Sequence, residues 1–159
     1  MSLRVLICAL VVMALGFCVV SPVRAEVLAE QTLWAGRTIN AGKVIVAVDG
    51  ENLIITYQTA NGWQLVNTHL YVSGDPLIKA APGRFEYQHE SLGGVTTDTY
   101  VIPFSDIDPT IWTVYIAAHA DVQLPKAGGY QEETAWGEGW TLEKGWAMYF
   151  AVTFREPPQ

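Results

Sequence analysis

Between residues 43 and 58, the chain forms short apolar runs rich in Val, Ile and Thr that are broken by Gly, Asn and Asp, a pattern typical of β-strands. The dipeptide Asp49-Gly50 interrupts this pattern. It favours a two-residue hairpin turn, because both turn positions need positive φ. A turn centred on this dipeptide pairs Val46 with Leu53 and Val44 with Ile55. The pattern therefore predicts two antiparallel strands whose Val, Ile and Leu side chains share one buried face.

The dipeptide Asn61-Gly62 gives the same kind of signal one strand later. A turn there pairs Leu53 with Leu70 and predicts a three-stranded meander that ends near Val72. Both turns independently select the same buried face, which consists of Val44, Val46, Val48, Leu53, Ile55, Tyr57, Val66 and Leu70. The opposite face is mixed, as a solvated or partly covered face is, and contains Ile45, Ala47, Asn52, Ile54, Thr56, Gln58, Leu65, Asn67, His69 and Tyr71.

Three further segments predict strands, at 95–104, 111–122 and 145–154. The second places Trp112, Val114, Ile116, Ala118, Ala120 and Val122 on one face and Thr113, Tyr115, Ala117, His119 and Asp121 on the other. Short strands without helices predict an all-β antiparallel β-sandwich of about 7–9 strands, with a closed β-barrel as the alternative. The expected organisation is a single domain at 42–155 and a short tail at 156–159. It is preceded by residues 26–41, an N-terminal extension or edge strand.

The first 25 residues have the three parts of a secretory signal peptide. A basic start is followed by an uncharged apolar run from Val5 to Val20, and Pro22 and Ala25 then supply a helix stop and a small residue for cleavage. The run is shorter than the roughly 20 residues that span a bilayer. We therefore expect a secreted protein, extracellular or periplasmic or associated with the cell surface. No transmembrane segment is expected after cleavage.

Removal of the signal peptide changes the chemistry of the chain. Cys8 and Cys18 both lie within it, so disulfides cannot stabilise the remainder. Seven basic and sixteen acidic residues remain, a net charge of −9. This charge repels phosphate backbones, so nucleic acid is not an expected partner.

The residues with the clearest metal-binding chemistry are His69, His89 and His119, because imidazole is a common zinc and copper ligand. No two of them have the spacing of a local metal motif. Asp106, Asp108 and Glu133 are carboxylates of the kind that bind calcium in flexible loops. Asp108 precedes a proline, so a turn capped by its own aspartate is the alternative. Calcium is the preferred metal hypothesis, ahead of zinc or copper.

The segment 128–146 combines glycines, glutamates and three tryptophans. Trp136 and Trp140 beside Glu132 are candidates for a sugar-stacking platform or a protein-binding hot spot, with burial in the core as the alternative. Trp146 continues the apolar stripe of the last strand and is expected in the core. The chain has no G-x-S-x-G elbow, phosphate-binding glycine loop or dinucleotide fingerprint.

Five strings together resemble a family of secreted or surface-attached microbial domains for which no activity is established. They are Thr68 to Val72 (THLYV), His89-Glu90, Ile116 to Ala120 (IAAHA), Glu133 to Gly137 (ETAWG) and Trp146 to Phe150 (WAMYF). The resemblance runs from about residue 42 to 154. It implies an extracellular domain and no particular mechanism.

Our leading functional hypothesis is an exported, non-catalytic binding or structural domain that acts in adhesion, coating or self-assembly. In the self-assembly version, residues 26–40 add a strand to the sheet edge of a neighbouring copy. Across the versions of this hypothesis, the expected partner is a glycan, a surface protein or a second copy of the chain. The alternatives are a calcium-dependent carbohydrate-binding module and a metallohydrolase that uses the three histidines.

Overall fold

The computed structural model describes residues 25–154, so the expected signal peptide lies, except for Ala25, outside the described residues. The described chain forms ten strands and two single-turn 3-10 helices. The strands are β1 (Glu26–Ala35), β2 (Ile39–Asp49), β3 (Asn52–Thr59), β4 (Gln64–Ser73), β5 (Tyr87–His89), β6 (Thr97–Pro103), β7 (Thr113–Lys126), β8 (Gly129–Gly137), β9 (Trp140–Thr141) and β10 (Met148–Thr153). The helices are η1 (Pro82–Arg84) and η2 (Phe104–Asp106). None of the helices in this part of the chain is long and apolar enough to cross a bilayer.

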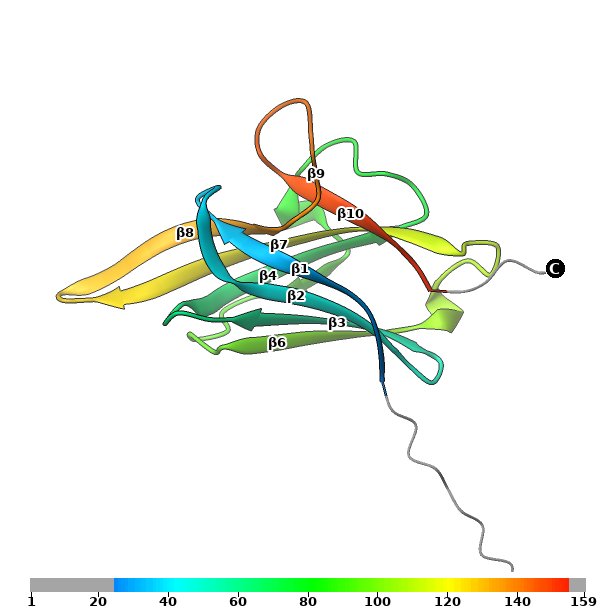
Figure 1. Ribbon diagram of the computed structural model, residues 1–159, viewed down its shortest axis with the longest axis horizontal. Coiled ribbons are helices and arrows are strands. Elements are labelled where there is room, and N and C mark those ends of the chain that lie inside the picture. The colour runs from blue at the N-terminus through cyan, green and yellow to red at the C-terminus, as the bar shows by residue number, and fades with distance from the viewer. Residues whose placement is uncertain (1–24, 155–159) are drawn as a thin grey trace, which may run out of the picture.

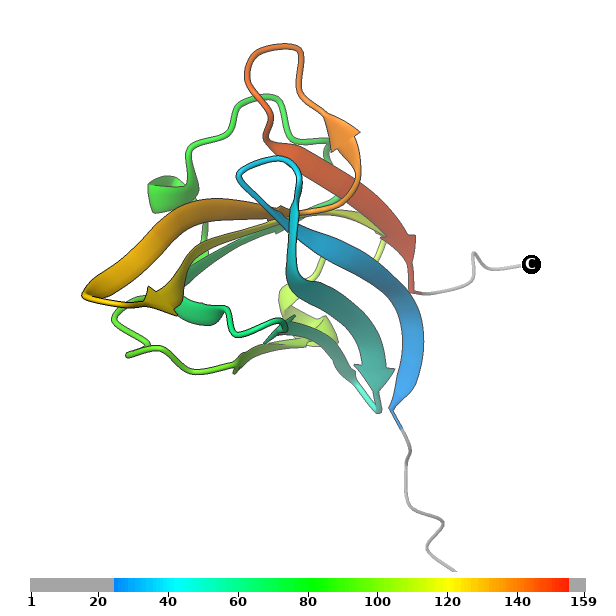
Figure 2. The same ribbon diagram turned by 60° about the vertical axis from the view of Figure 1, so that its left-hand side comes forward.

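All strand pairs are antiparallel, and the main sheet has the order β5-β4-β7-β8-β1-β2-β3-β6. The sheet curls until its two ends approach each other, so that the strands enclose an interior (Figures 1 and 2). A single bridge between Leu65 and Val95 links the ends. The predicted all-β antiparallel fold is confirmed, in a nearly closed, barrel-like form.

The interior holds the main hydrophobic core, to which almost every strand contributes. Val46, Leu53 and Leu70, which the two turns predicted on one face, are all fully buried in it. The predicted inward face of β7 is also confirmed, except that Trp112 lies before the strand and is only partly buried. Its fully or almost fully buried residues are Val114, Ile116, Ala118, Ala120 and Val122.

The predicted pairing of β2 with β3 is correct, but its register differs by two residues. The turn lies at Gly50-Glu51, so Val46 pairs with Ile55 and Val48 with Leu53. Because side chains alternate with a period of two, a shift of two residues leaves every side chain on its predicted face. The buried face of this hairpin was therefore predictable although its register was not.

The predicted hairpin between β3 and β4 is wrong. Asn61 and Gly62 do have positive φ, of 56° and 85°, but the strands on either side of them do not pair. β3 instead pairs with β6 along seven positions, and β4 pairs with β7 and β5. The turn residues thus fix the local bend, while Trp63, 3% exposed, packs into the core and the chain crosses to the other side of the barrel.

A register irregularity in β4, between Leu65 and Asn67, corrects a second expectation. Leu65 was expected on the mixed face, yet it is fully buried in the interior. Val66 was expected on the buried face and is only partly buried. A β-bulge adds one residue to a strand and so exchanges the faces of the residues before it.

Residues 26–41 form β1 and the start of β2. β1 pairs with β2 at nine positions, and its last three residues pair with β8. Leu33 and Ala35 are fully buried. The last three residues of β1 are therefore paired on both edges, whereas the ladder of residues 26–31 is with β2 alone. Self-assembly through this segment stays a hypothesis.

A second apolar cluster lies on the outer face of β4, β7 and β8. The segment between β4 and β5 and the segment from β8 to β10 both lie on this side of the sheet (Figure 1). They contribute Leu77, Phe85 and Ala147, which pack with Ala117 of β7 and Trp136 of β8. This outer cluster buries a sheet face that in a bare barrel would meet solvent, and the polar residues described next lie within that face.

Candidate functional site

A row of polar and aromatic side chains crosses the covered outer face at one level of the sheet. Gln88 of β5, His69 of β4, His119 of β7 and Trp136 of β8 are direct neighbours in register. The two histidines and the tryptophan are each only 5–6% exposed. We call His69, His119 and Trp136 the histidine row.

The two imidazoles of the row face each other. The Nδ1 atoms of His69 and His119 are 3.1 Å apart. On the other side of the His69 ring, Nε2 lies 2.8 Å from Oε1 of Glu90. The ring of Trp136 packs edge-on to His119, with the centroids 4.7 Å apart.

These distances restrict the protonation of the row. An ionised carboxylate accepts hydrogen bonds, so His69 Nε2 carries the hydrogen that is donated to Glu90. Nδ1 of neutral His69 is then an acceptor, and the hydrogen between the two rings belongs to Nδ1 of His119. Burial lowers the pKa of His119 to about 4, and His69 acts in the same direction. His119 is therefore neutral at physiological pH.

A carboxylate also lies near the outer nitrogen of His119. Oδ1 of Asp121 is 3.9 Å from His119 Nε2, and Asp121 accepts a hydrogen bond of 2.9 Å from Asn67. Asp121 opposes the effect of burial on the pKa of His119. Both histidines thus have a carboxylate near Nε2 and each other's ring at Nδ1.

His89 occupies a different place. It lies opposite Thr68 in the β4–β5 ladder, its ring stacks on Tyr100 at 4.2 Å, and its Nδ1 contacts the Asp98 carboxylate at 2.9 Å. Tyr100 Oη in turn donates to the Thr68 carbonyl. These residues join β4 and β5 to β6 and close the seam of the barrel. Burial raises the pKa of Tyr100 to about 12, which keeps the phenol neutral in this seam.

The structure therefore brings two of the three histidines together and places the third in the seam. Over residues 25–154, no group of three or more His, Cys, Asp or Glu side chains is arranged to hold a metal ion. The metallohydrolase hypothesis required all three histidines in one site.

The carboxylates that sequence analysis considered for calcium are dispersed. Asp108 Oδ1 accepts hydrogen bonds from the backbone N and hydroxyl of Thr110, at 2.8 and 2.7 Å, and these bonds lower its pKa. Asp106 lies in η2 and accepts a hydrogen bond from Ser105. Glu133 contacts Gln131 on its own strand.

Glu132 lines an open hollow of about 510 Å³ beside the histidine row. Asn67, Asp121 and Thr134 form other parts of its wall. The backbone N of Ser91, the residue after Glu90, donates a hydrogen bond of 2.9 Å to Oδ1 of Asn67. The rim of the histidine row is thus polar and carries several carboxylates.

The tryptophans 136 and 140 have different environments. Trp136 is buried in the outer cluster, whereas Trp140 is 58% exposed. Trp140 is the register partner of Tyr149 in the β9–β10 ladder, with the ring centroids 5.6 Å apart. The ring of Tyr149 also packs near that of Tyr115 in β7, with the ring centroids 6.2 Å apart. We call Trp140, Tyr149 and Tyr115 the aromatic strip.

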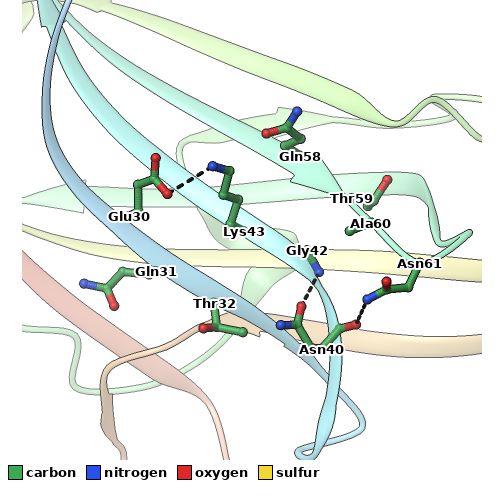
Figure 3. A pocket seen from close by; sticks show the side chains of 10 residues that line it. All are labelled: Glu30, Gln31, Thr32, Asn40, Gly42, Lys43, Gln58, Thr59, Ala60 and Asn61. Carbon is green, nitrogen blue, oxygen red and sulfur yellow. Dashed lines mark hydrogen bonds and ion pairs between the residues drawn. The ribbon is translucent and has the colours of Figure 1, made fainter.

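A second hollow, of about 500 Å³, lies over β1, β2 and β3 (Figure 3). Its only charged residues, Glu30 and Lys43, form an ion pair of 3.0 Å. Asn40 Oδ1 accepts a hydrogen bond from the backbone N of Gly42, and Asn61 Nδ2 donates one to the backbone carbonyl of Asn40. No aromatic side chain lines it, so it offers less for ligand recognition than the aromatic strip.

Comparison with known protein families, curated proteins and solved structures gave no match. The chemistry of the described residues is therefore the basis for any functional inference. Sequence analysis named both histidines of the row and Trp140, but not the partnership of His69 with Glu90 or the roles of Tyr115 and Tyr149. Those relations depend on the β4–β5, β7–β10 and β9–β10 pairings, which no local pattern indicated.

Proposed function

We propose that the protein is exported and acts outside the cytoplasm as a non-catalytic binding domain, with sugar rings as the ligand of its aromatic strip. The observation that carries this proposal is the exposed indole of Trp140, held by Tyr149 on a short ladder beside the barrel. A large exposed aromatic ring loses little conformational entropy on binding and offers an apolar face to a ligand.

Two features support the export part of the proposal. The N-terminal sequence has the pattern of a signal peptide, and β1 begins at Glu26, directly after the expected cleavage position. The chain from Glu26 onward contains no cysteine and buries a continuous apolar interior. Such a domain does not depend on the redox state of its surroundings.

The strip has the extent and polarity that a sugar ligand requires. Its three rings come from β9, β10 and β7, and their exposure decreases from Trp140 to the partly buried tyrosines. The tyrosine hydroxyls add hydrogen-bonding groups at the edge of an apolar surface.

The experiment is a binding assay on a glycan array and on insoluble cellulose, chitin and peptidoglycan. Trp140→Ala should weaken binding at least tenfold, because truncation of a tryptophan at the centre of a binding surface costs about 2 kcal/mol or more. Tyr130→Ala is the matched control. Tyr130 is 59% exposed at the far end of the β7–β8 hairpin, away from the strip (Figure 1).

Two results would count against the proposal. One is wild-type protein that binds none of these carbohydrates. The other is an equal loss in the Tyr130 and Trp140 variants, which would indicate non-specific adhesion of exposed aromatic rings. A parallel assay in chelator shows whether calcium takes part.

A further inference from the structure

The histidine row can present two ring nitrogens to one ion. Each of its imidazoles has a carboxylate near Nε2, Glu90 at 2.8 Å and Asp121 at 3.9 Å. A carboxylate favours a hydrogen on the nitrogen that faces it. In the tautomer described above, a hydrogen on His119 Nδ1 lies between the rings. If this hydrogen moves to Nε2 of His119, two Nδ1 lone pairs face each other at 3.1 Å and can bind one cation.

We infer that His69 and His119 form a two-histidine site for a late first-row divalent metal ion such as Cu²⁺ or Zn²⁺, bound between their Nδ1 atoms. Bonds from imidazole nitrogen to zinc are about 2.0–2.1 Å long, so two such ligands in a tetrahedral arrangement lie about 3.4 Å apart. The observed separation of 3.1 Å needs to widen by only a few tenths of an ångström.

Glu90 has the place that a carboxylate takes behind a metal-bound histidine. It accepts the Nε2 hydrogen of His69 and so directs the Nδ1 lone pair inward. Such carboxylate partners fix the ring orientation and raise the basicity of the ligand. His119 supplies its own Nδ1 lone pair after its hydrogen moves to Nε2, on the side of Asp121. Both ligands stay neutral in this exchange, so metal binding through it releases no proton.

The surroundings favour the entry of a cation. The His69 and His119 side chains retain 7% and 8% exposure. Glu90 and Asp121 at the rim are 54% and 36% exposed, and Glu132 lines the adjoining hollow. Two neutral nitrogens select copper, nickel or zinc over calcium, which prefers oxygen ligands.

Within the described part of the chain no third side chain completes the set. Water or an incoming ligand would therefore fill the remaining coordination positions. The site is separate from the aromatic strip, so its failure or success does not depend on the sugar-binding proposal.

The test uses the full chain with the substitutions Cys8→Ser and Cys18→Ser. It is titrated with Cu²⁺ and, separately, with Zn²⁺, and binding is measured by isothermal titration calorimetry. The serine substitutions prevent either thiol from competing for the ion. We expect one ion per chain and a Cu²⁺ paramagnetic resonance spectrum with hyperfine coupling to two imidazole nitrogens. His69→Gln and His119→Gln should each weaken binding at least tenfold, and Glu90→Gln by about 10- to 100-fold.

His89→Gln is the matched control and should bind as the parent does, because His89 lies in the seam. A second measurement covers the case in which a row variant does not fold. In the parent protein, Zn²⁺ should shift the ¹⁵N resonances of Nδ1 in two histidines and leave the third unchanged. Absence of one-to-one binding, coupling to fewer than two nitrogens, or a loss confined to His89→Gln would each overturn the inference.

Discussion

Gly42 has a backbone conformation that a side chain would strain. Its φ is +145°, and a Cβ there would overlap the carbonyl oxygen of Gln58 on the neighbouring strand β3. We expect Gly42→Ala to lower the free energy of unfolding by about 2–3 kcal/mol or more, measured by urea denaturation. Gly129→Ala is the control, because a Cβ at that strand position meets no atom within 4 Å. Equal stability of the two variants would contradict this account of β2.

His119 makes stability depend on pH in a defined direction. Its pKa is lowered to about 4 in the fold, mainly by burial, from an ordinary value of 6.5. Between these values the unfolded chain binds a proton that the folded chain excludes, so stability is complete above about pH 6.5 and is lost as the pH falls toward 4. This titration contributes roughly 2–3 kcal/mol to the free energy of unfolding at neutral pH.

The measurement is urea denaturation between pH 7.5 and 4.5. His119→Gln should depend less on pH over this window than the parent, whatever its absolute stability. Ile78→Ala, which removes an exposed apolar side chain and no titratable group, should keep the steeper slope of the parent. An unchanged slope in His119→Gln would show that another group titrates in this range.

At the scale of elements, the outer cluster is what buries the histidine row. Phe85, 7% exposed, packs against Trp136 with the ring centroids 6.3 Å apart, and its ring also contacts Tyr71. Phe85→Ala should cost about 3 kcal/mol of stability, as other large-to-small substitutions in cores do. It should also increase the rate at which diethyl pyrocarbonate modifies the histidines of the row.

Ile78→Ala is the matched control for Phe85→Ala, since Ile78 lies in the same segment and is 90% exposed. Its stability should stay within about 0.5 kcal/mol of the parent. If the two variants behaved alike, the segment between β4 and β5 would not be a packed cover of the sheet.

The outer cluster also explains which strand faces could be predicted as buried from the sequence. The inward faces of β2, β3 and β7 follow from alternation, because one side of each strand meets the interior. Alternation also placed Ala117 and His119 on the outer face, but it gave no sign that both are buried there. Their burial comes from segments without periodicity, around Leu77 and Ala147.

For the whole molecule, the limit of sequence reasoning was the pairing of distant strands. A turn dipeptide such as Asn61-Gly62 determines local φ values, but the direction of the chain beyond it depends on where Trp63 and Leu65 find apolar contacts. The histidine row illustrates the consequence, because β4 and β7 bring together residues fifty positions apart. Residue type indicated His69 and His119 as candidates, and only the closed topology separates them from His89.

The topology also predicts what the N-terminal strand does. β1 lies between β8 and β2, and it contributes the fully buried Leu33 and Ala35 to the interior. Deletion of residues 26–35 should therefore unfold the domain, with loss of dispersed amide resonances, because it removes two ladders and opens the core to water. A synthetic peptide of residues 26–35, added to the shortened chain, should restore the fold. A shortened chain that stays folded and merely changes from oligomer to monomer would instead mean that β1 serves assembly between copies.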